Sequence, residues 1–553
     1  MIRPRVWTTK GRHGEPPGGV AEPTPADRPF GRPRAWRRAI GDISTGMDLH
    51  HASTIPDAVR RSAGRTPDRV ALHFAGRQWT YRQLDEAVTR AAGHLLGLGL
   101  RKGDRVAAFG RNSDAFLILF LACGRAGLVH VPVNYNATAG ELRYFVEQSG
   151  SAALFHDAEF TERAAELAAS SAALHRETLE RLLVRAEAGP VPALDVTVRD
   201  EDLVQLLYTS GTTAAPKGAM MTHRALLHEY LSCVLALDLR ESDRPLHALP
   251  LYHSGQLHVF LMPYLLLGAE NRLVRAPEPA EVLRLIEREG VDSFFAPPTV
   301  WTALEAHPDL RTADLSALRK AYYGASVMPA PVLARLRAAL PGAGFYNAFG
   351  QSEIGPLVSV LRPEDHELRP DSAGRPVLFV EVAVLGEDGL PTAPGEPGEI
   401  CYRSPQLCTG YWEKPAETEA AFAGGWFHSG DLVRQDAEGY LYVVDRLKDV
   451  INTGGVLVAS REVEDVLYGH PAVAEAAVIG LPDPHWIEAV TAVVVCRRPV
   501  TEAELIAWAR ERLPAFKTPK TVRFTQALPK NASGKLLKRE LRERFTGSDA
   551  RWQ

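Results

Sequence analysis

The segment 203–218 contains the residues best suited to chemistry in this chain. An apolar run, 203–208, leads into a polar stretch made of Thr209, Ser210, Gly211, Thr212 and Thr213, and a lysine, Lys217, follows. Backbone N–H groups in a tight turn of small residues bind anions, hydroxyls donate further hydrogen bonds, and a lysine supplies positive charge. The segment therefore predicts a strand followed by a loop that binds a polyphosphate.

The loop differs from the Walker A motif of P-loop NTPases. That motif has a glycine before the lysine and a serine or threonine after it, whereas Pro216 and Gly218 occupy these positions here. Glycine-containing surface loops are also common as plain connections. Other segments must therefore decide between a phosphate site and an ordinary loop.

Composition limits the possible partners of the chain. Its 553 residues exceed what one hydrophobic core holds. The 63 basic and 67 acidic residues leave a net charge of −4, which favours a small-molecule substrate and no nucleic acid. The five cysteines show neither C-x-x-C nor Cys/His spacing, which argues against a disulfide framework or a zinc site and fits a cytoplasmic protein.

Two further features concern the ends and the surface of the chain. No apolar run approaches the roughly 20 residues of a membrane-spanning helix, so we expect no integral membrane association. Residues 1–46 are rich in proline, glycine and arginine and have no sustained apolar period, which predicts a disordered basic extension. Met47 is a candidate translation start.

The elements that must position the loop follow an α/β pattern. Amphipathic stretches such as 81–96 and 280–289 alternate with short apolar runs such as 129–133 and 294–296, which predicts parallel sheets covered by helices. Short strands with glycine and proline turns over 371–442 predict a β-rich subdomain. We expect an N-terminal domain over 47–445 and a smaller α+β C-terminal domain over 446–553.

Six motifs in order then point to one family. They are the loop at 208–218, Pro250-Leu251-Tyr252-His253, Phe349-Gly350-Gln351-Ser352-Glu353, Ser429-Gly430-Asp431, Asp445-Arg446-Leu447-Lys448-Asp449 and Ser533-Gly534-Lys535. Together they resemble the adenylate-forming superfamily, closest to its acyl-CoA synthetases, over about residues 50–545. The resemblance implies a large N-terminal domain and a small mobile C-terminal domain. It also implies ATP, Mg²⁺ and coenzyme A: a carboxylate attacks the α-phosphate, and a thiol then takes the acyl group.

The resemblance assigns the phosphate and metal chemistry to a few residues. Residues 209–213 and Lys217 are expected to bind the β- and γ-phosphates, and Ser352 the α-phosphate. Glu353 is the expected magnesium carboxylate, with Thr209 beside it. Lys535 is expected to align the acid with the α-phosphate.

The remaining expected sites bind the nucleoside and the acid or permit domain rotation. The expected nucleotide-binding residues are Gly324, Ala325, Ser326, Asn347, Phe349, Gly350, Asp431, Arg446 and Lys448. Phe349 is expected to stack on adenine, and Asp431 to bind the ribose hydroxyls. Lys448 matches the hinge of the C-terminal domain, and His253 matches the wall of the acyl pocket.

Two departures from the family pattern leave the acceptor open. Ala214 stands where glycine is common, and Gly454-Gly455 is followed by the apolar Val456-Leu457-Val458. In the family that the chain resembles, the turn at Gly454-Gly455 lines the pantetheine tunnel. A carrier protein or an amine is therefore an alternative acceptor. An unusual acid such as nitrite, used in ATP-dependent diazotisation, is an alternative substrate. A non-catalytic nucleotide-binding protein is a third interpretation. The sequence leaves three classes of acid open: a medium- or long-chain aliphatic acid, an aryl acid and a biosynthetic intermediate.

Overall fold

The computed structural model describes residues 53–169, 174–209, 215–326, 328–530 and 536–546. Contacts divide the chain into two compact units, 1–50 and 51–553. The first unit, with the predicted extension over 1–46, lies outside the described residues. The fold below belongs to the second unit, and its class confirms the predicted α/β architecture.

A six-stranded sheet carries the strand that precedes the phosphate loop. Its order is β6 (His175–Thr178), β5 (Ser151–His156), β3 (Arg105–Phe109), β4 (Val129–Val133), β7 (Leu203–Thr209) and β8 (Lys217–Thr222). All neighbours run parallel except β7 and β8, which pair antiparallel. All five residues of β4 are buried, as expected for a parallel strand with both faces covered.

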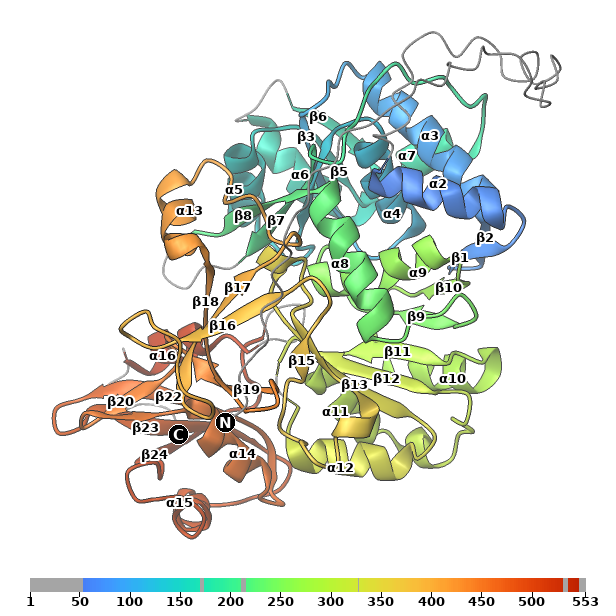
Figure 1. The fold of residues 1–553 in the computed structure, drawn as a ribbon. Coiled ribbons are helices and arrows are strands. Elements are labelled where there is room, and N and C mark those ends of the chain that lie inside the picture. The colour runs from blue at the N-terminus through green and yellow to red at the C-terminus, as the bar shows by residue number, and fades with distance from the viewer. Residues whose placement is uncertain (1–52, 170–173, 210–214, 327, 531–535, 547–553) are drawn as a thin grey trace, which may run out of the picture. The chain divides into compact units, whose positions relative to one another are not determined.

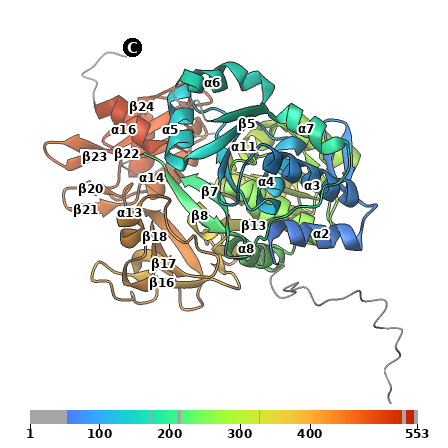
Figure 2. The same cartoon turned by 90° about the horizontal axis from the view of Figure 1, so that it is seen from above.

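Helices cover the six-stranded sheet. The first group is α2 (Ile55–Arg65), α3 (Tyr81–Gly97), α4 (Asp114–Arg125) and α7 (Leu179–Glu187), which pack on one another (Figures 1 and 2). The helices α5 (Ala139–Ser149) and α6 (Thr161–Ala165) follow β4 and β5. Residues 114–124 of α4 are all buried, because this apolar helix lies within the core.

A nine-stranded sheet forms the next layer. Its order is β15 (Arg375–Pro376), β14 (Ser359–Leu361), β13 (Gly344–Phe349), β12 (Lys320–Gly324), β11 (Ser293–Ala296), β9 (Pro245–His247), β10 (Asn271–Leu273), β1 (Val70–Phe74) and β2 (Arg77–Thr80). The strands from β13 to β1 are parallel to one another. Their carboxyl ends therefore lie at one edge, where ligands bind in open α/β sheets.

Alternate residues of β12 show how this sheet is packed. Ala321 and Tyr323 belong to a core cluster with α10 (Pro279–Glu289), α11 (Pro298–Ala306) and α12 (Ala330–Ala339). Tyr322 belongs to the opposite cluster, with residues near α8 (His223–Ala236) and α9 (Met262–Leu267). The period of two places helices on both faces of the sheet.

Two antiparallel sheets complete the second unit. One is β16 (Glu381–Leu385), β17 (Pro397–Arg403), β18 (Phe427–Gln435) and β19 (Leu441–Arg446), with α13 (Pro415–Ala421) between β17 and β18 in the chain. The other is β21 (Val456–Val458), β20 (Ile451–Thr453), β23 (Ile487–Cys496) and β22 (Val473–Asp483), to which β24 (Thr521–Phe524) adds a parallel strand. The helices α14 (Ser460–Tyr468), α15 (Glu502–Arg510) and α16 (Lys538–Thr546) belong to this last part. No helix in the described ranges combines the length and the apolar character needed to cross a bilayer.

Candidate active site

Two paired strands flank the predicted phosphate loop. Thr209 is the last residue of β7 and lies opposite Lys217, the first residue of β8. Helix α5 holds the neighbouring residues: Tyr144 donates its hydroxyl hydrogen to the Pro216 carbonyl at 2.7 Å, and Tyr208 donates to the Gln148 side chain. The predicted loop residues Ser210, Gly211, Thr212 and Thr213 lie outside the described residues, as does Lys535.

Four side chains from distant parts of the chain meet beside this loop. The Thr209 hydroxyl donates to Glu353 Oε1 at 2.9 Å, and the Tyr411 hydroxyl donates to the same oxygen at 3.2 Å. Lys217 Nζ lies 5.1 Å from the centre of the Tyr411 ring. The structure thus brings the predicted residues Thr209, Lys217 and Glu353 together. Tyr411, which lies among them, was not predicted from the sequence.

The backbone around Glu353 is fixed on the side away from these groups. Ser352 and Glu353 lie in the short helix Ser352–Ile354, and the Glu353 carbonyl accepts a hydrogen bond from the Cys408 N–H at 2.7 Å. The Gln406 amide donates to the carbonyls of Ile354 and Leu357 at 3.3 and 3.1 Å. These contacts present the Glu353 side chain in a defined direction, which a metal ligand requires.

Ser352 connects this turn to the segment that contains His253. The hydroxyls of Ser352 and Ser254 are hydrogen-bonded at 2.8 Å. Beyond Ser254, residues Gly255–Leu261 form a π-helix, a wide turn common at functional sites. A Cβ atom at Gly255 would lie 3.7 Å from Phe295 and 3.8 Å from His253, so this glycine lies directly beside the two rings.

The expected adenine region lies at the carboxyl ends of β12 and β13. Gly324 pairs with Ala348, and a Cβ atom at Gly324 would come within 2.2 Å of the Ala348 carbonyl oxygen. Only glycine therefore allows these strands to approach so closely. Ala325 follows with φ of 64°, in the left-handed region, and Ser326 is exposed.

The other expected adenine-binding residues come from β13 and the turn after it. Phe349 is half-buried and packs against the core. The Asn347 amide donates to the Ser372 carbonyl at 3.0 Å, so one of its donors is already used. A Cβ atom at Gly350 would lie 1.8 Å from the Pro356 carbonyl oxygen, so the glycine permits this tight turn.

The expected ribose-binding pair is formed by neighbouring strands. Asp431 on β18 lies opposite Arg446 on β19, and Arg446 Nε is 3.0 Å from Asp431 Oδ1. Asp431 is only 4% exposed. The guanidinium places a positive charge beside this carboxyl group, whose oxygens are hydrogen-bond acceptors.

Glu399 on β17 orders the turn that carries Asp431. Its Oε1 accepts the Gly430 N–H at 2.8 Å, and its Oε2 lies 2.8 Å from His428 Nδ1. The Ser429 hydroxyl donates to the Ile400 carbonyl at 2.5 Å and accepts the Asp431 N–H at 3.0 Å. Two hydrogen bonds, to the Glu399 side chain and to the Ile400 carbonyl, thereby attach this turn to β17.

Cys401 joins this group, so Glu399, Cys401 and His428 place possible metal-ligand atoms within 4.8 Å of one another. Sequence spacing did not reveal this, because His428 comes from the next strand. Two ligands on one tetrahedral zinc ion would lie about 3.3 Å apart. The 2.8 Å between His428 Nδ1 and Glu399 Oε2 is shorter than that and is a hydrogen-bond distance. Burial raises the pKa of Cys401 to about 12, so this thiol stays protonated.

The expected hinge continues from β19 into the C-terminal part of the chain. Asp445 Oδ2 accepts the backbone N–H and the hydroxyl of Ser460, at 2.6 and 2.7 Å, and so caps the start of α14. Lys538 Nζ donates to the Ser460 hydroxyl at 2.5 Å and pairs with Glu464 at 2.7 Å. Lys448 is exposed in the turn that follows.

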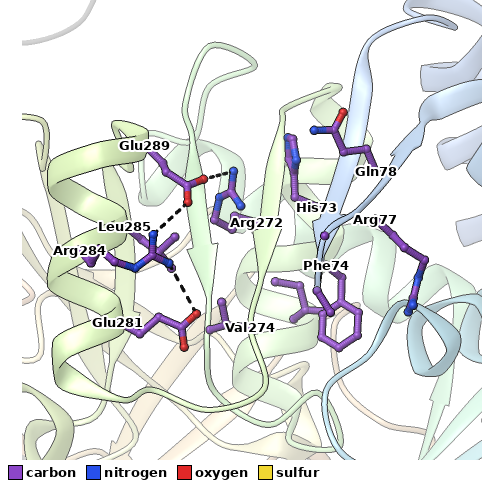
Figure 3. Close-up of a pocket in the computed structure, with 13 residues that line it drawn as sticks. His73, Phe74, Arg77, Gln78, Arg272, Val274, Glu281, Arg284, Leu285 and Glu289 are labelled. Carbon is purple, nitrogen blue, oxygen red and sulfur yellow. Dashed lines mark ion pairs between the residues drawn. The ribbon is translucent and has the colours of Figure 1, made fainter.

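One surface hollow lies apart from the predicted residues. It has a volume of about 400 Å³ and lies at the carboxyl ends of β1 and β10 (Figure 3). Arg272 pairs with Glu289, and Arg284 lies 3.6 Å from Glu289 and 3.9 Å from Glu281. Because these guanidinium groups already face carboxylates, the hollow offers little net charge for a phosphate.

The chain is similar to known proteins over most of its length. The family model "AMP-binding enzyme" matches residues 59–412, and the model "AMP-binding enzyme C-terminal domain" matches residues 462–535. A feruloyl-CoA synthase of Amycolatopsis sp is 40% identical over 492 residues, which cover 88% of this chain and 98% of that protein.

Two solved structures are also similar. An anthranilate CoA ligase in complex with anthranoyl-AMP has a TM-score of 0.85 at 27% identity, covering 90% of this chain and 98% of its own. An o-succinylbenzoate coenzyme A synthetase of Bacillus subtilis, in complex with ATP and magnesium ion, has a TM-score of 0.79 at 31% identity, covering 88% of this chain and 98% of its own. The chain therefore belongs to the AMP-binding enzyme family, in its acyl-CoA synthetase branch.

Proposed function

We propose that this protein joins an aryl-substituted carboxylic acid, such as ferulate, to coenzyme A in two ATP-dependent half-reactions. The acid first attacks the α-phosphate of ATP, which gives an acyl-adenylate and pyrophosphate. The thiol of coenzyme A then takes the acyl group and releases AMP. The observation that carries the proposal is the group of Thr209, Lys217 and Glu353 beside the phosphate loop.

These residues suit a magnesium–polyphosphate complex. Glu353 and the Thr209 hydroxyl are oxygen donors, which Mg²⁺ prefers, and they would hold the ion next to Lys217. When bound, Mg²⁺ would screen the negative charge of the phosphates. Lys217 and the loop residues 210–213 would bind the β- and γ-phosphates, and the Ser352 hydroxyl would donate to the α-phosphate.

The nucleoside and the domain movement involve the other predicted residues. Phe349 and Asn347 would contact adenine, with Gly324, Ala325, Ser326 and Gly350 lining that region, and Asp431 and Arg446 would bind the ribose. Lys535 would align the carboxylate with the α-phosphate. We propose that the chain divides into two domains between residues 445 and 446, and that the C-terminal domain rotates about Lys448 between the two half-reactions.

The aryl acid is proposed from the surroundings of Gly255. This glycine lies beside the rings of His253 and Phe295 and next to Ser254, which is hydrogen-bonded to Ser352. An aromatic substrate ring would gain edge-to-face contacts there. The similarity to a feruloyl-CoA synthase and to an anthranilate CoA ligase supports the same class of acid.

A carrier protein is the second candidate acceptor. The side chains of Val456 and Leu457, on the strand after the Gly454–Gly455 turn, are 45% and 61% exposed. A protein surface would cover such apolar side chains better than a polar tunnel would. The first half-reaction is the same for both acceptors.

Product analysis tests the proposal. Full-length protein is incubated with ATP, Mg²⁺ and ferulate, with and without coenzyme A or a phosphopantetheinylated carrier protein, and AMP and thioesters are measured by mass spectrometry. We expect feruloyl-CoA and equimolar AMP, and the Glu353→Gln variant as control should produce neither at a comparable rate. Turnover of a dodecanoate control but not ferulate would contradict the aryl acid, and thioester on the carrier protein alone would contradict coenzyme A.

A further inference from the structure

Tyr411 lies in a segment that is attached to the strand carrying Lys217. The Met220 N–H donates to the Gly410 carbonyl at 2.9 Å, and the Trp412 N–H donates to the Gly218 carbonyl at 2.8 Å. The Tyr411 N–H donates to the Thr418 hydroxyl at 2.9 Å. Tyr411 is thus held at a fixed position beside β8, although it is almost two hundred residues from Lys217 in the chain.

The hydroxyl of Tyr411 restrains one oxygen of the Glu353 carboxylate. Tyr411 and Thr209 both donate to Oε1, at 3.2 and 2.9 Å. Within the part of the chain that the structure describes, no donor is seen at Oε2. Two donors on one oxygen fix the rotation of the carboxylate group and leave the other oxygen for a cation.

The ring of the same residue faces Lys217. The ammonium nitrogen lies 5.1 Å from the ring centre, within the range of a cation–π interaction. Tyr411 is only 9% exposed, whereas Lys217 is half-buried, so water is excluded from the ring side of the contact more than from the ammonium group. The ring therefore restricts where the lysine ammonium can lie.

We propose that Tyr411 is a positioning residue for two groups at once: its hydroxyl orients the carboxylate of Glu353 toward a divalent cation, and its ring orients Lys217 toward the phosphates. This inference rests on the proposed function, which assigns a metal to Glu353 and phosphates to Lys217. The two roles reside in different atoms of one side chain. Tyr411→Phe removes only the hydroxyl, and Tyr411→Leu removes the ring as well.

Calorimetric titration of ATP into the full-length protein separates these roles without catalysis. The dissociation constant of ATP is measured with saturating Mg²⁺ and again with EDTA. We expect Tyr411→Phe to reduce the Mg²⁺-dependent gain in affinity by about tenfold and to leave the affinity in EDTA unchanged. Tyr411→Leu should also weaken binding in EDTA by about three- to tenfold, because Lys217 loses its ring contact.

Tyr442 provides a matched control. Its hydroxyl donates to Asp436 Oδ2 at 3.1 Å, and the Arg434 guanidinium lies 5.9 Å from its ring centre. Tyr442→Phe and Tyr442→Leu should leave both ATP affinities at the wild-type values. A purely structural role of Tyr411 would lower the melting temperature without separating the two affinities.

The outcomes also separate this inference from the proposed function. The inference is wrong if Tyr411→Phe keeps the full Mg²⁺-dependent gain while Glu353→Gln loses it, or if Tyr411→Leu binds ATP in EDTA as tightly as Tyr411→Phe. If Glu353→Gln itself keeps the gain, the metal role assigned to Glu353 fails, and with it the role assigned to the Tyr411 hydroxyl.

Discussion

Replacing Glu399 with glutamine tests whether the turn carrying Asp431 is held from β17. The carboxylate satisfies two donors with two oxygens, the Gly430 N–H and His428 Nδ1, both at 2.8 Å. Glutamine has one acceptor oxygen and an NH₂ group of the same size. One of the two contacts therefore loses its carboxylate oxygen, and with it a charge-assisted hydrogen bond.

The size of the effect follows from these contacts. A hydrogen bond to a charged group contributes about 1.5–3 kcal/mol. We take the lower end, because the Glu399 side chain remains 21% exposed. About 1.5 kcal/mol corresponds to a roughly tenfold change in an equilibrium constant. If the ordered turn is the form that binds ribose, the apparent KM for ATP rises by up to about tenfold, while KM for the acid is unchanged.

Acid-dependent exchange of labelled pyrophosphate into ATP measures both KM values in one assay. Glu396→Gln is the control, because Glu396 accepts a single long contact of 3.4 Å from the Ala393 N–H in an exposed turn. Our interpretation of Glu399 is refuted if the Glu399 and Glu396 variants have the same KM for ATP. A rise in both KM values with a lower melting temperature would equally contradict it.

Three further predictions concern other parts of the chain. Lys535→Ala should lower the rate of pyrophosphate exchange by about 100-fold or more without changing the melting temperature, because a charge that acts only in the transition state is removed; full exchange activity would contradict this role. Gly324→Ala should lower the free energy of unfolding by about 1–3 kcal/mol in urea titrations, because its Cβ would lie 2.2 Å from the Ala348 carbonyl oxygen; wild-type stability would show that β12 and β13 can separate freely. Burial raises the pKa of Asp157 to about 6, whereas an aspartate in an unfolded chain has a pKa of roughly 3.9. The folded state therefore binds the proton more tightly, and the free energy of unfolding falls as the pH rises from about 4 to about 6. Asp157→Asn should remove that fall in urea titrations at the two pH values, and an unchanged pH dependence would contradict the assignment.

The fold was predictable where the pattern is local. The apolar run 203–208 lies in β7, as predicted, and Thr209 ends that strand; the antiparallel strand β8, which begins at Lys217, was not predicted. The strands β9 and β10 have three residues each, too few to show an alternating pattern. The π-helix Gly255–Leu261 has a wider turn than an α-helix, so its apolar residues are not expected to repeat every 3.6 positions.

The supporting residues of the site were not predictable in this way. Tyr411 meets Glu353 across 58 positions of chain, and Glu399 meets Gly430 across 31. Nothing in the sequence around either residue indicates its partner, because the contact depends on how separate strands pair. Motifs therefore identified groups expected to touch the substrates, and the structure added the groups that orient them.

In the proposed first half-reaction, a carboxylate oxygen of the acid attacks the α-phosphate of ATP. Incubation of the protein with ATP, Mg²⁺, coenzyme A and ferulate labelled with ¹⁸O in its carboxylate tests this claim directly. Mass spectrometry should find one ¹⁸O atom in AMP, the other in the thioester carbonyl, and none in pyrophosphate. AMP without label, or label in inorganic phosphate, would contradict the account.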